Sequence, residues 1–344
     1  MKAVMKIERK RGALEVRDLE VPRPDEGEVL IKVEYAGICG SDLHAYNYDR
    51  GYEFMTVPVI LGHEFVGEVV ELGSGVNEFK RGERVVAEAS QYCGSCINCR
   101  DGRTNICENI RLFGLHLHGG MAEYACVNAR YLHKLPKGLP SSAGVLVEPI
   151  SVVIHAVCER CKICPGDSVL IIGPGIIGLL AAQVARAIGA SLIIVAGRNE
   201  DLAHRLAWAQ KSGFVTICTD NSSLEGELWR LTGQRKVDVV LECSGDKKAI
   251  LEALDVVRKG GQVTLIGLYK EHTEIFLTPL IRNEITFNTS YSSRWLNYKQ
   301  AIELMLKGKV EVESLVRTFP LGKAIEAFDA SFKREVIKAA LEMQ

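Results

Sequence analysis

Four cysteines lie within one short segment of the chain, CGSCINCRDGRTNIC. They are Cys93, Cys96, Cys99 and Cys107, in the spacing C-x2-C-x2-C-x7-C. Four thiolates in so short a loop can complete a tetrahedral shell around zinc and leave no position open for a substrate. An iron–sulfur cluster takes the same ligands and is the alternative metal centre. We expect a structural site that stabilises a lobe of about residues 90–110 and takes no part in chemistry.

A second set of side chains has the types found in catalytic metal sites and is spread over the segments GICGSDLH, LGHEFVGE and VEPISV. Its members are Cys39, Ser41, His44, His63, Glu64 and Glu148. One thiolate, one imidazole and one or two carboxylates give a catalytic zinc soft and hard ligands, with one position left for substrate. Taken singly, Cys39 can be a core thiol and His63 a satisfied buried histidine. The order of the set beside a nucleotide-binding motif favours the catalytic interpretation.

That motif is formed by Gly173, Gly175 and Gly178, in the sequence GPGIIG. Glycines also mark ordinary turns, so a G-x-G-x-x-G match is weak evidence by itself. Here the motif directly follows the apolar segment SVLII and opens the helical segment GLLAAQVARAIG. This context brings a tight turn and a helix N-terminus to the pyrophosphate of a dinucleotide. We therefore predict a Rossmann unit.

The pattern of the chain changes at about residue 165. Before this point, short apolar segments such as GEVLIKVEYAGIC alternate with glycine-rich turns and predict strands. After it, apolar strands alternate with helical segments, from SVLIIG through SLIIVA and VDVVLEC to QVTLIGL. Such a βαβ series forms a parallel sheet covered by helices. Beyond about residue 288, NYKQAIELMLKGKV and LGKAIEAFDASF predict amphipathic helices, and VIKAALEM predicts a final strand.

Length and composition indicate a globular protein of two domains. The chain has 344 residues, with 42 basic and 43 acidic side chains, and each domain is long enough to bury a core. This balance gives no reason to expect nucleic acid or an anionic membrane as a partner. The start, MKAVMKIERKRG, lacks the apolar core of a signal peptide, and the longest apolar run is interrupted by Glu148 and Pro149. We expect a cytoplasmic protein whose eleven cysteines are thiols or metal ligands.

Six segments follow one another along the chain: GICGSDLH, GHEFVGEV, the four-cysteine lobe, EPISV, GPGIIG and PLGKAIEAF. In them the sequence closely resembles the zinc-dependent medium-chain dehydrogenases and reductases, the superfamily of alcohol and polyol dehydrogenases, in its branch of sorbitol and threonine dehydrogenases. The resemblance covers nearly the whole chain. It implies an α/β fold with a β-rich GroES-like catalytic domain, residues 1–151 and 290–344. A Rossmann domain with a doubly wound parallel sheet, residues 152–289, is inserted into it.

The resemblance also implies a ligand set. Cys39, His63 and Glu64 are the expected ligands of a catalytic zinc. Glu148 resembles the carboxylate of polyol dehydrogenases, which either replaces a ligand or holds the zinc-bound water. The four lobe cysteines then hold a structural zinc, so two zinc ions per chain are expected.

The implied activity is hydride transfer between a secondary alcohol or polyol, or its ketone, and a nicotinamide cofactor. Ser41 and His44 resemble the relay that moves the alcohol proton toward solvent. The expected partners are a small-molecule alcohol or ketone and, as in relatives, further copies of the chain in a homodimer or homotetramer. Neither nucleic acid nor a membrane is expected as a partner.

Three other activities compete with this one. A threonine-type amino-alcohol dehydrogenase shares much of the pattern, but AEASQYCG lacks the histidine that this branch carries just before the first lobe cysteine. A nucleotide-binding zinc protein without catalysis is disfavoured, because such a protein would be free to lose Cys39, His63 and the relay pair. A zinc-free quinone reductase is disfavoured by the same ligands and by the cysteine lobe.

Two segments of the predicted Rossmann domain are expected to line the cofactor. Their residues are Gly173, Gly175, Ile177 and Gly178 in the first segment, and Ile266, Gly267 and Leu268 in the second.

The choice of cofactor is predicted from the segment SLIIVAGRNED. Gly197 lies 19 residues after the last glycine of the motif, where NAD-preferring relatives carry an aspartate for the ribose hydroxyls. Glycine removes the charge that repels a 2′-phosphate, and Arg198, with Arg205, supplies guanidinium groups suited to phosphate. NADP(H) is therefore favoured over NAD(H). In the alternative interpretation, Glu200 or Asp201 takes the ribose role.

Two further patterns are not assigned to chemistry. CERCKIC places Cys158, Cys161 and Cys164 in another C-x2-C-x2-C series, but no fourth ligand follows at the distance seen in the lobe. His116 and His118, in GLHLHGG, would share one face of a strand, and we expect them to line the pocket or face solvent.

Overall fold

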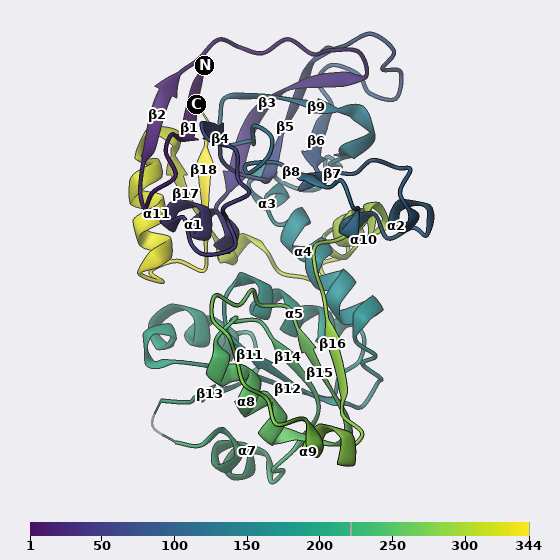
Figure 1. Ribbon diagram of the computed structural model, residues 1–344, viewed down its shortest axis with the longest axis vertical. Coiled ribbons are helices and arrows are strands. Elements are labelled where there is room, and N and C mark those ends of the chain that lie inside the picture. Colours follow the sequence, from purple (N-terminus) through teal and green to yellow (C-terminus); the bar gives the residue numbers. More distant parts are fainter. Residues whose placement is uncertain (221, 344) are drawn as a thin grey trace. The chain divides into compact units, whose positions relative to one another are not determined.

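The structure is a computed structural model that describes residues 1–220 and 222–343, and its elements are labelled in Figure 1. It divides into two compact units. The first unit combines Met1–Ser151 with the chain from Ser292 onward, and the second is Val152–Tyr291. The sequence pattern places the second boundary two residues earlier, between 289 and 290.

A seven-stranded, mostly antiparallel sheet forms the centre of the first unit. Its strands follow the order β10-β6-β5-β3-β18-β17, and β9 pairs with β3 off this path. The bounds are β3 Glu28–Gly37, β5 Glu64–Leu72, β6 Arg84–Ala87, β9 Tyr124–Asn128, β10 Leu132–Lys134, β17 Val316–Pro320 and β18 Lys338–Glu342. The late strand β18 (yellow in Figure 1) pairs antiparallel with the early strand β3, so Ala340 lies opposite Gly37. Strand pairing therefore joins the two ends of the chain in one unit.

Two smaller sheets complete the strands of the first unit. The orders are β2-β1-β4 and β7-β8. The bounds are β1 Lys2–Lys6, β2 Leu14–Asp18, β4 Val59–Ile60, β7 Ser90–Gln91 and β8 Arg111–Leu112. Along β3, Val29, Ile31 and Val33 belong to the hydrophobic core while Lys32 is exposed. This alternation is the period of two that a strand imposes on its side chains.

The helices of the first unit are short. Their bounds are α1 Gly40–Asn47, α2 Ile97–Arg100, α3 Ser141–Gly144, α10 Trp295–Leu306 and α11 Ala324–Phe332, with the helical turns η1 Thr104–Ile106, η2 Ala129–Tyr131, η6 Glu313–Leu315 and η7 Leu321–Lys323. The chain passes from the first unit to the second within α4, Val147–Ile154.

The second unit contains six parallel strands in the order β13-β12-β11-β14-β15-β16. The bounds are β11 Ser168–Ile172, β12 Leu192–Gly197, β13 Val215–Cys218, β14 Val237–Glu242, β15 Val257–Leu265 and β16 Thr286–Thr289. β11 is buried along its whole length, as expected for a parallel strand covered on both faces. In this doubly wound order, two halves diverge from β11 and β14, and a dinucleotide binds at the carboxyl ends of the strands where the order reverses.

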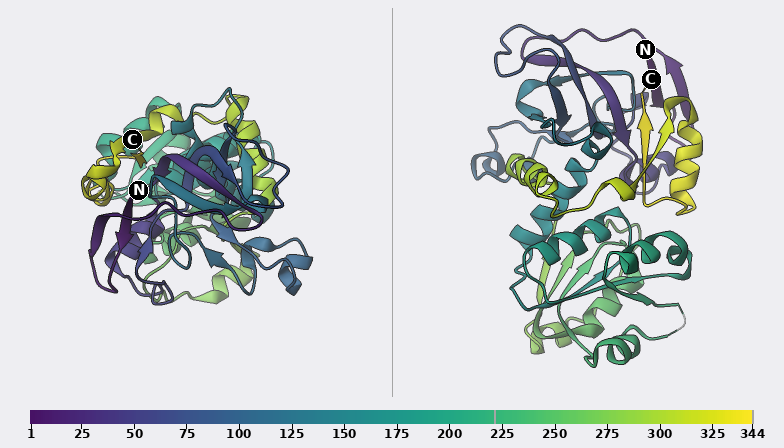
Figure 2. Two further views of the ribbon diagram at one scale, coloured as in Figure 1. Left: turned by 90° about the horizontal axis from the view of Figure 1, so that it is seen from above. Right: turned by 180° about the vertical axis from the view of Figure 1, so that it is seen from behind.

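Helices lie on both sides of this sheet (Figure 2). Their bounds are α5 Ile176–Ala187, α6 Ala207–Lys211, α7 Leu224–Thr232, α8 Lys247–Val256 and α9 Leu277–Arg282, with the shorter helical segments η3 His155–Arg160, η4 Asn199–Asp201 and η5 Leu202–Leu206. The expected α/β class, with a β-rich part and a doubly wound parallel sheet, is confirmed.

One helical stretch of the described chain, Ser141–Arg160, is long and apolar enough to cross a membrane when judged by length and composition alone. Its mean hydropathy is 1.6, and 78% of its most apolar window is buried inside the structure. Core helices of globular proteins pass the same test, so this stretch is weak evidence for a membrane span.

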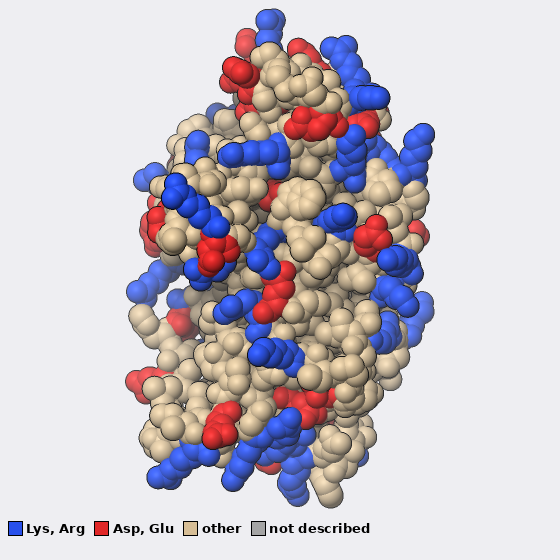
Figure 3. Space-filling view, turned by 90° about the vertical axis from the view of Figure 1, so that its right-hand side faces the viewer, with Lys and Arg blue, Asp and Glu red and all other residues tan. Residues whose placement is uncertain are grey.

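Basic and acidic side chains are mixed on the molecular surface. On the face drawn in Figure 3, Lys and Arg stand among Asp and Glu, and other residues separate them. This mixture agrees with the formal net charge of −1.

Candidate metal centres and active site

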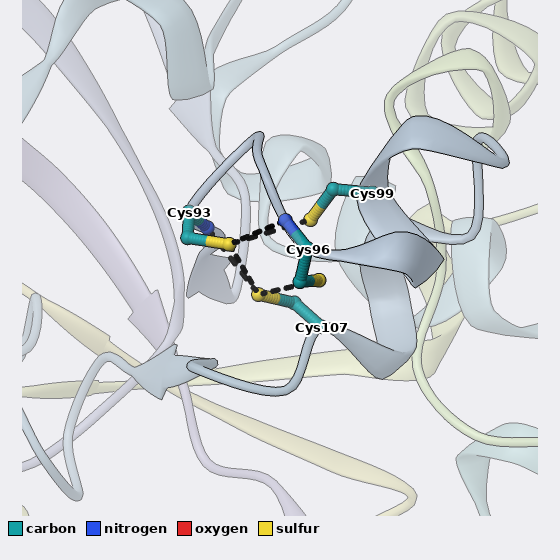
Figure 4. A group of neighbouring side chains, drawn as sticks. All are labelled: Cys93, Cys96, Cys99 and Cys107. Carbon is teal, nitrogen blue, oxygen red and sulfur yellow. Dashed lines mark hydrogen bonds between the residues drawn. The ribbon is translucent and has the colours of Figure 1, made fainter.

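The four lobe cysteines converge on one point of the first unit (Figure 4). Cys96 precedes α2, Cys99 lies within it, and Cys107 follows η1. The sulfur–sulfur distances are 3.5 Å for Cys93–Cys107, 3.9 Å for Cys96–Cys107 and 4.0 Å for Cys93–Cys99. A tetrahedral shell with zinc–sulfur bonds of about 2.3 Å requires sulfur–sulfur separations of about 3.8 Å. The cysteines therefore fit a zinc ion, with no position left for a substrate.

Backbone N–H groups stabilise the anionic form of these sulfurs. Ser95 and Cys96 donate to Cys93 Sγ at 3.5 Å and 3.3 Å, and Asn109 donates to Cys107 Sγ at 3.3 Å. The N–H of Ser95 is the largest influence that lowers the pKa of Cys93, to about 5. The thiolate is the form that binds metals, so these hydrogen bonds favour the metal-binding form of Cys93, whereas burial raises the pKa of Cys99 to about 12.

A second group of metal-binding side chains lies where α1 and β5 begin. Cys39 is the N-cap of α1, His63 directly precedes β5, and Glu64 is the first residue of β5. Their ligand atoms all lie within 4.8 Å of one another. Glu64 is buried, and its Oε1 has no hydrogen-bond partner. Because an unsatisfied buried carboxylate oxygen is costly, a bound cation would supply what this mixed ligand set lacks.

Asp42 is a buried acid that faces His63 within this group. Its carboxylate accepts the N–H of Cys39 at 2.8 Å, lies 3.9 Å from His63 Nδ1 and is 1% exposed. Burial, the largest single influence, lowers the pKa of His63, but the charges of Asp42, Cys39 and Glu148 together raise it well above the usual value. Asp42 faces Nδ1 of His63 beyond hydrogen-bond distance, and Nε2 is the nitrogen on the side of Ser41.

Lys338, on the last strand of the first unit, forms an ion pair with Glu64. Both side chains are 1% exposed. A Cβ on Gly37 would lie 2.5 Å from Glu64 Oε2 and 2.9 Å from Lys338 Cε, so the glycine makes room for the pair. Burial lowers the pKa of Lys338, but the charges of Glu64 and Cys39 outweigh this effect and raise it. The ammonium group thus compensates part of the negative charge of the ligand set.

Glu148, on α4, is 7% exposed. Burial raises its pKa to about 7, and the charge of His63 opposes this shift. Glu148 is outside the group of three whose ligand atoms lie within 4.8 Å of one another. Glu148 therefore lies outside the tight group of three and interacts with it electrostatically, through His63.

Ser41 and His44 both lie on α1 and have different partners. Ser41 Oγ lies 3.4 Å from His63 Nε2. His44 Nδ1 lies 2.7 Å from Asp49 Oδ2, and its ring stacks on Tyr52 with centroids 5.5 Å apart. When Nδ1 donates its proton to Asp49, Nε2 of His44 remains free to accept one.

The glycine motif lies between β11 and α5. Gly173 has φ +101°, and a Cβ on Gly178 would lie 2.0 Å from the Gly173 carbonyl oxygen, so the turn requires both glycines. Gly175 is the N-cap of α5, and a Cβ there would meet no atom within 4 Å. The N-terminus of α5, with Ile177 in its first turn, is therefore open, and it fits the pyrophosphate of a dinucleotide.

Gly197, at the end of β12, packs against the glycine motif. A Cβ there would lie 2.7 Å from Pro174 Cγ, so close packing requires a residue without a side chain. Asp201 is 1% exposed, accepts the Arg198 N–H at 3.1 Å and lies 3.3 Å from Arg205 Nη1. The carboxylate of buried Asp201 thus binds Arg198 and Arg205 of its own loop and is not placed to bind a ribose.

Arg198 is paired with an acid that the sequence pattern did not single out. Its Nη1 lies 3.2 Å from Asp220 Oδ1, and the Asn199 N–H donates to Asp220 Oδ2 at 2.6 Å. A 2′-phosphate would compete with Asp220 for the guanidinium group of Arg198.

Two groups in the described part of the chain could hold a metal, and neither includes Cys158, Cys161 or Cys164. His116 Nδ1 and His118 Nδ1 accept the N–H groups of Leu112 and Ile60, each at 3.1 Å. These histidines therefore accept structural backbone hydrogen bonds within the first unit.

Comparison with known proteins identifies the family. The family description "Alcohol dehydrogenase GroES-like domain" matches residues 25–137, and "Zinc-binding dehydrogenase" matches residues 177–307. The chain is 35% identical over 345 residues to sorbitol dehydrogenase of Halalkalibacterium halodurans, which covers 99% of each protein. This chain belongs to the zinc-dependent medium-chain dehydrogenases. It is also 33% identical to L-threonine 3-dehydrogenase of Bacillus velezensis, over 99% of this chain and 98% of that protein.

Solved structures of similar dehydrogenases include complexes with both nicotinamide cofactors. A protein described as a zinc-binding dehydrogenase from Sinorhizobium meliloti 1021, bound to NADP, has TM-score 0.90 and 30% identity, over 99% of this chain and 98% of that one. An alcohol dehydrogenase from Escherichia coli CFT073, bound to NADH, has TM-score 0.90 and 29% identity, over 99% of each chain. The medium-chain dehydrogenase described here is an oxidoreductase that acts on CH–OH donors.

Sequence reasoning missed Asp42 and Lys338 as neighbours of His63 and Glu64. Asp42 had a local signal, because it lies three residues after Cys39 in the spacing of a capping box. Lys338 had none, since only the pairing of β18 with β3 brings it to Glu64.

Proposed function

We propose that this dehydrogenase interconverts a secondary alcohol and its ketone, with polyols and sugar alcohols as the substrate class. The observation that carries the proposal is the tight group of Cys39, His63 and Glu64 beside Ser41, because it joins a ligand set to a hydroxyl that can take a proton. Similarity to a sorbitol dehydrogenase along the whole chain supports the polyol class. Glu148 supports it as well, since it matches the carboxylate of polyol dehydrogenases.

Two zinc ions per chain are part of the proposal. Cys39, His63 and Glu64 would hold the catalytic ion, with Glu148 as a ligand or as the group that holds water, and the four lobe cysteines would hold the structural ion. When bound, the catalytic zinc supplies a Lewis acid that lowers the pKa of a substrate hydroxyl, and the nicotinamide supplies the hydride acceptor.

Residues of α1 handle the proton. Oxidation of a CH–OH group releases one hydride and one proton. Ser41 accepts the proton from the substrate hydroxyl and passes it on, and Nε2 of His44 accepts it next, because Nδ1 is held by Asp49. Asp42 keeps His63 in the orientation that the ligand set requires.

The cofactor that we propose is NADP(H), bound along Gly173, Gly175, Ile177 and Gly178 and along Ile266, Gly267 and Leu268. An acidic side chain at position 197 is excluded by Pro174, so the usual repulsion of a 2′-phosphate at this position is missing. Arg198 supplies a guanidinium group on the loop after β12, and Arg205 adds a second positive charge nearby. Asp220 opposes this choice through its ion pair with Arg198.

We further propose that the dehydrogenase works in the cytoplasm as a homodimer or homotetramer. Strand β16 ends the six-stranded sheet and pairs on one side only, with β15. On the preceding helix α9 and its N-cap, Phe276, Leu277 and Ile281 are 76%, 60% and 74% exposed. An open sheet edge beside exposed apolar side chains is typical of a surface that a partner covers, and an identical edge can pair with it about a two-fold axis.

Turnover and metal content of the purified protein test the proposed function. We expect two zinc ions per chain and oxidation of members of a panel of secondary alcohols, polyols, sugar acids and threonine with NAD+ or NADP+. Cys39→Ala should remove turnover and one zinc and leave dinucleotide binding intact. Cys126→Ala, a partly buried thiol on β9, is the matched control and should retain both. A single zinc in the wild type, or turnover by Cys39→Ala, would contradict the proposal.

A further inference from the structure

The second unit contains a buried carboxylate that the proposed mechanism does not use. Glu242 is the last residue of β14 and is 0% exposed. A carboxylate without partners is very costly in such a place. The groups that surround Glu242 must therefore donate hydrogen bonds to its carboxylate. These donors identify the segments that Glu242 connects.

The donors to Glu242 come from two loops. In the loop after β14, the N–H of Ser244 donates at 2.6 Å, its hydroxyl at 2.5 Å, and the N–H of Gly245 at 3.1 Å. In the loop after β15, the Tyr269 hydroxyl donates to the other carboxylate oxygen at 2.6 Å. One buried side chain thus ties together the loops that follow two neighbouring parallel strands.

Glycines bring these loops into backbone contact. A Cβ on Gly245 would lie 2.3 Å from the carbonyl oxygen of Leu268, and a Cβ on Gly267 would lie 2.2 Å from Gly245 N. On the other side, a Cβ on Gly173 would lie 2.8 Å from Ser244 N. The loop after β14 therefore packs between the glycine turn after β11 and the loop after β15.

The strand order assigns these loops to one half of the cofactor. In a doubly wound sheet, each half receives one nucleotide, and the halves meet at the switch point between β11 and β14. Arg198 and Asp220 lie after β12 and β13 and belong to the adenosine half. The loops after β14 and β15 belong to the other half, which receives the nicotinamide riboside.

We propose that Glu242 is a positioning residue for the nicotinamide half of the cofactor, because it holds residues 243–246 and 266–269 in the conformation that receives the nicotinamide. This inference rests on the proposed dinucleotide function. Glu242 is fully buried, so it would act on the cofactor through Ser244, Gly245 and Tyr269.

Binding of whole and truncated cofactors to the zinc-loaded protein tests this role. ADP-ribose has the adenosine, the pyrophosphate and both riboses but lacks the nicotinamide ring, so the difference between NADH and ADP-ribose reports on the contacts of the nicotinamide ring alone. Glu242→Gln keeps the shape but replaces one acceptor oxygen by a donor that faces other donors. It should weaken binding of NADH and NADPH by about tenfold, leave ADP-ribose within about twofold, and raise the KM for cofactor more than it lowers kcat.

Two further variants keep the test decisive. Tyr269→Phe removes a single donor and leaves the carboxylate with its other partners, so it should fold and show the same split, at about threefold. Glu225→Gln, an acid on α7 of the same unit whose partly exposed side chain pairs with Lys236, outside the loops after β14 and β15, should change nothing. Equal weakening of NADH and ADP-ribose, or unchanged binding of both in Glu242→Gln and Tyr269→Phe, would overturn the positioning role. A wild type that binds neither cofactor would overturn the proposed function and this inference with it.

Discussion

At the scale of single residues, the charges around Cys39, His63 and Glu64 decide how the ligand set is held. Lys338 compensates Glu64 from the side of β18, and Asp42 faces His63 from within α1. Each partner is almost fully buried, so solvent does not screen these charges as it does on the surface. The proposed zinc ligands would thus be held by side chains that themselves lie outside the metal's shell.

Asp42→Asn should weaken binding of the catalytic zinc about 10- to 100-fold, because a neutral amide orients the imidazole less strongly than a carboxylate. Competition with a chelator measures this affinity, and the lobe zinc of the same protein serves as an internal reference. Asp18→Asn, at the end of the exposed strand β2, is the control. Equal zinc affinities in the two variants would show that Asp42 does not orient His63.

Arg198 and Asp220 should shift cofactor preference in opposite directions. Arg198→Ala removes a charge-assisted contact and should weaken 2′,5′-ADP about tenfold relative to 5′-AMP. Asp220→Asn frees the guanidinium group from its ion pair and should strengthen 2′,5′-ADP about threefold. Calorimetry on both ligands gives the ratio, with Arg230→Ala, on the exposed side of α7, as the control. A ratio that neither variant changes would exclude this pair from cofactor choice.

At the scale of elements, one buried lysine fastens the N-terminal hairpin to α1. Lys6, the last residue of β1, is fully buried, and its ammonium donates to the carbonyl groups of Lys10, Gly12 and Tyr46. The carbonyl of Tyr46 lies in the last turn of α1, where the helix dipole favours a positive charge. Among the described residues, the hydrogen bonds of the Lys6 ammonium go to these three carbonyl groups and to no carboxylate.

Lys6 should make stability depend on pH. Burial lowers its pKa from 10.5 to about 8 in the folded protein. Below pH 8 both states hold the proton, and between pH 8 and 10.5 only the unfolded chain does. The free energy of unfolding should therefore rise with pH in this window, by up to about 1.4 kcal/mol per pH unit from this group.

Urea unfolding of the wild type and of Lys6→Met across this range of pH isolates that contribution as a difference in slope. Lys10→Met, whose ammonium is exposed, should keep the slope of the wild type. The same slope in the wild type and in Lys6→Met would refute the assignment.

At the scale of the whole molecule, β16 is one of the two edge strands of the six-stranded sheet, with β13 at the other edge. Strand β16 is mostly exposed and follows the exposed apolar side chains of α9, and of its backbone groups the Thr289 carbonyl accepts a hydrogen bond from Arg160. Ile281→Glu places a charge in this surface and should give a smaller species in sedimentation velocity, because burying an unpaired carboxylate in an interface is costly. Ile325→Glu, exposed on α11 of the other unit, is the control. An Ile281→Glu protein of wild-type size would exclude this edge as the interface.

The fold class and the family could be predicted from the sequence because their signals are local. Alternation of apolar strands with helical segments marks a parallel sheet wherever it occurs, and the glycine motif needs only the strand before it and the helix after it. The lobe cysteines also lie close together in sequence, so their spacing alone indicates a shared metal. Spacing predicts less about Gly197: the glycine is required by packing against Pro174, a contact between the end of β12 and the turn after β11 that spacing does not encode.

The sequence by itself determined the family, the α/β class and the residue types of both metal groups. Only the tertiary structure decided which acids and bases act together: Lys338 with Glu64, Asp220 with Arg198, and Glu242 with the loops after β14 and β15. The physical reason is distance along the chain. Lys338 and Glu64 are 274 residues apart, and their contact follows from the pairing of β18 with β3, which depends on the packing of the whole unit and on no local pattern.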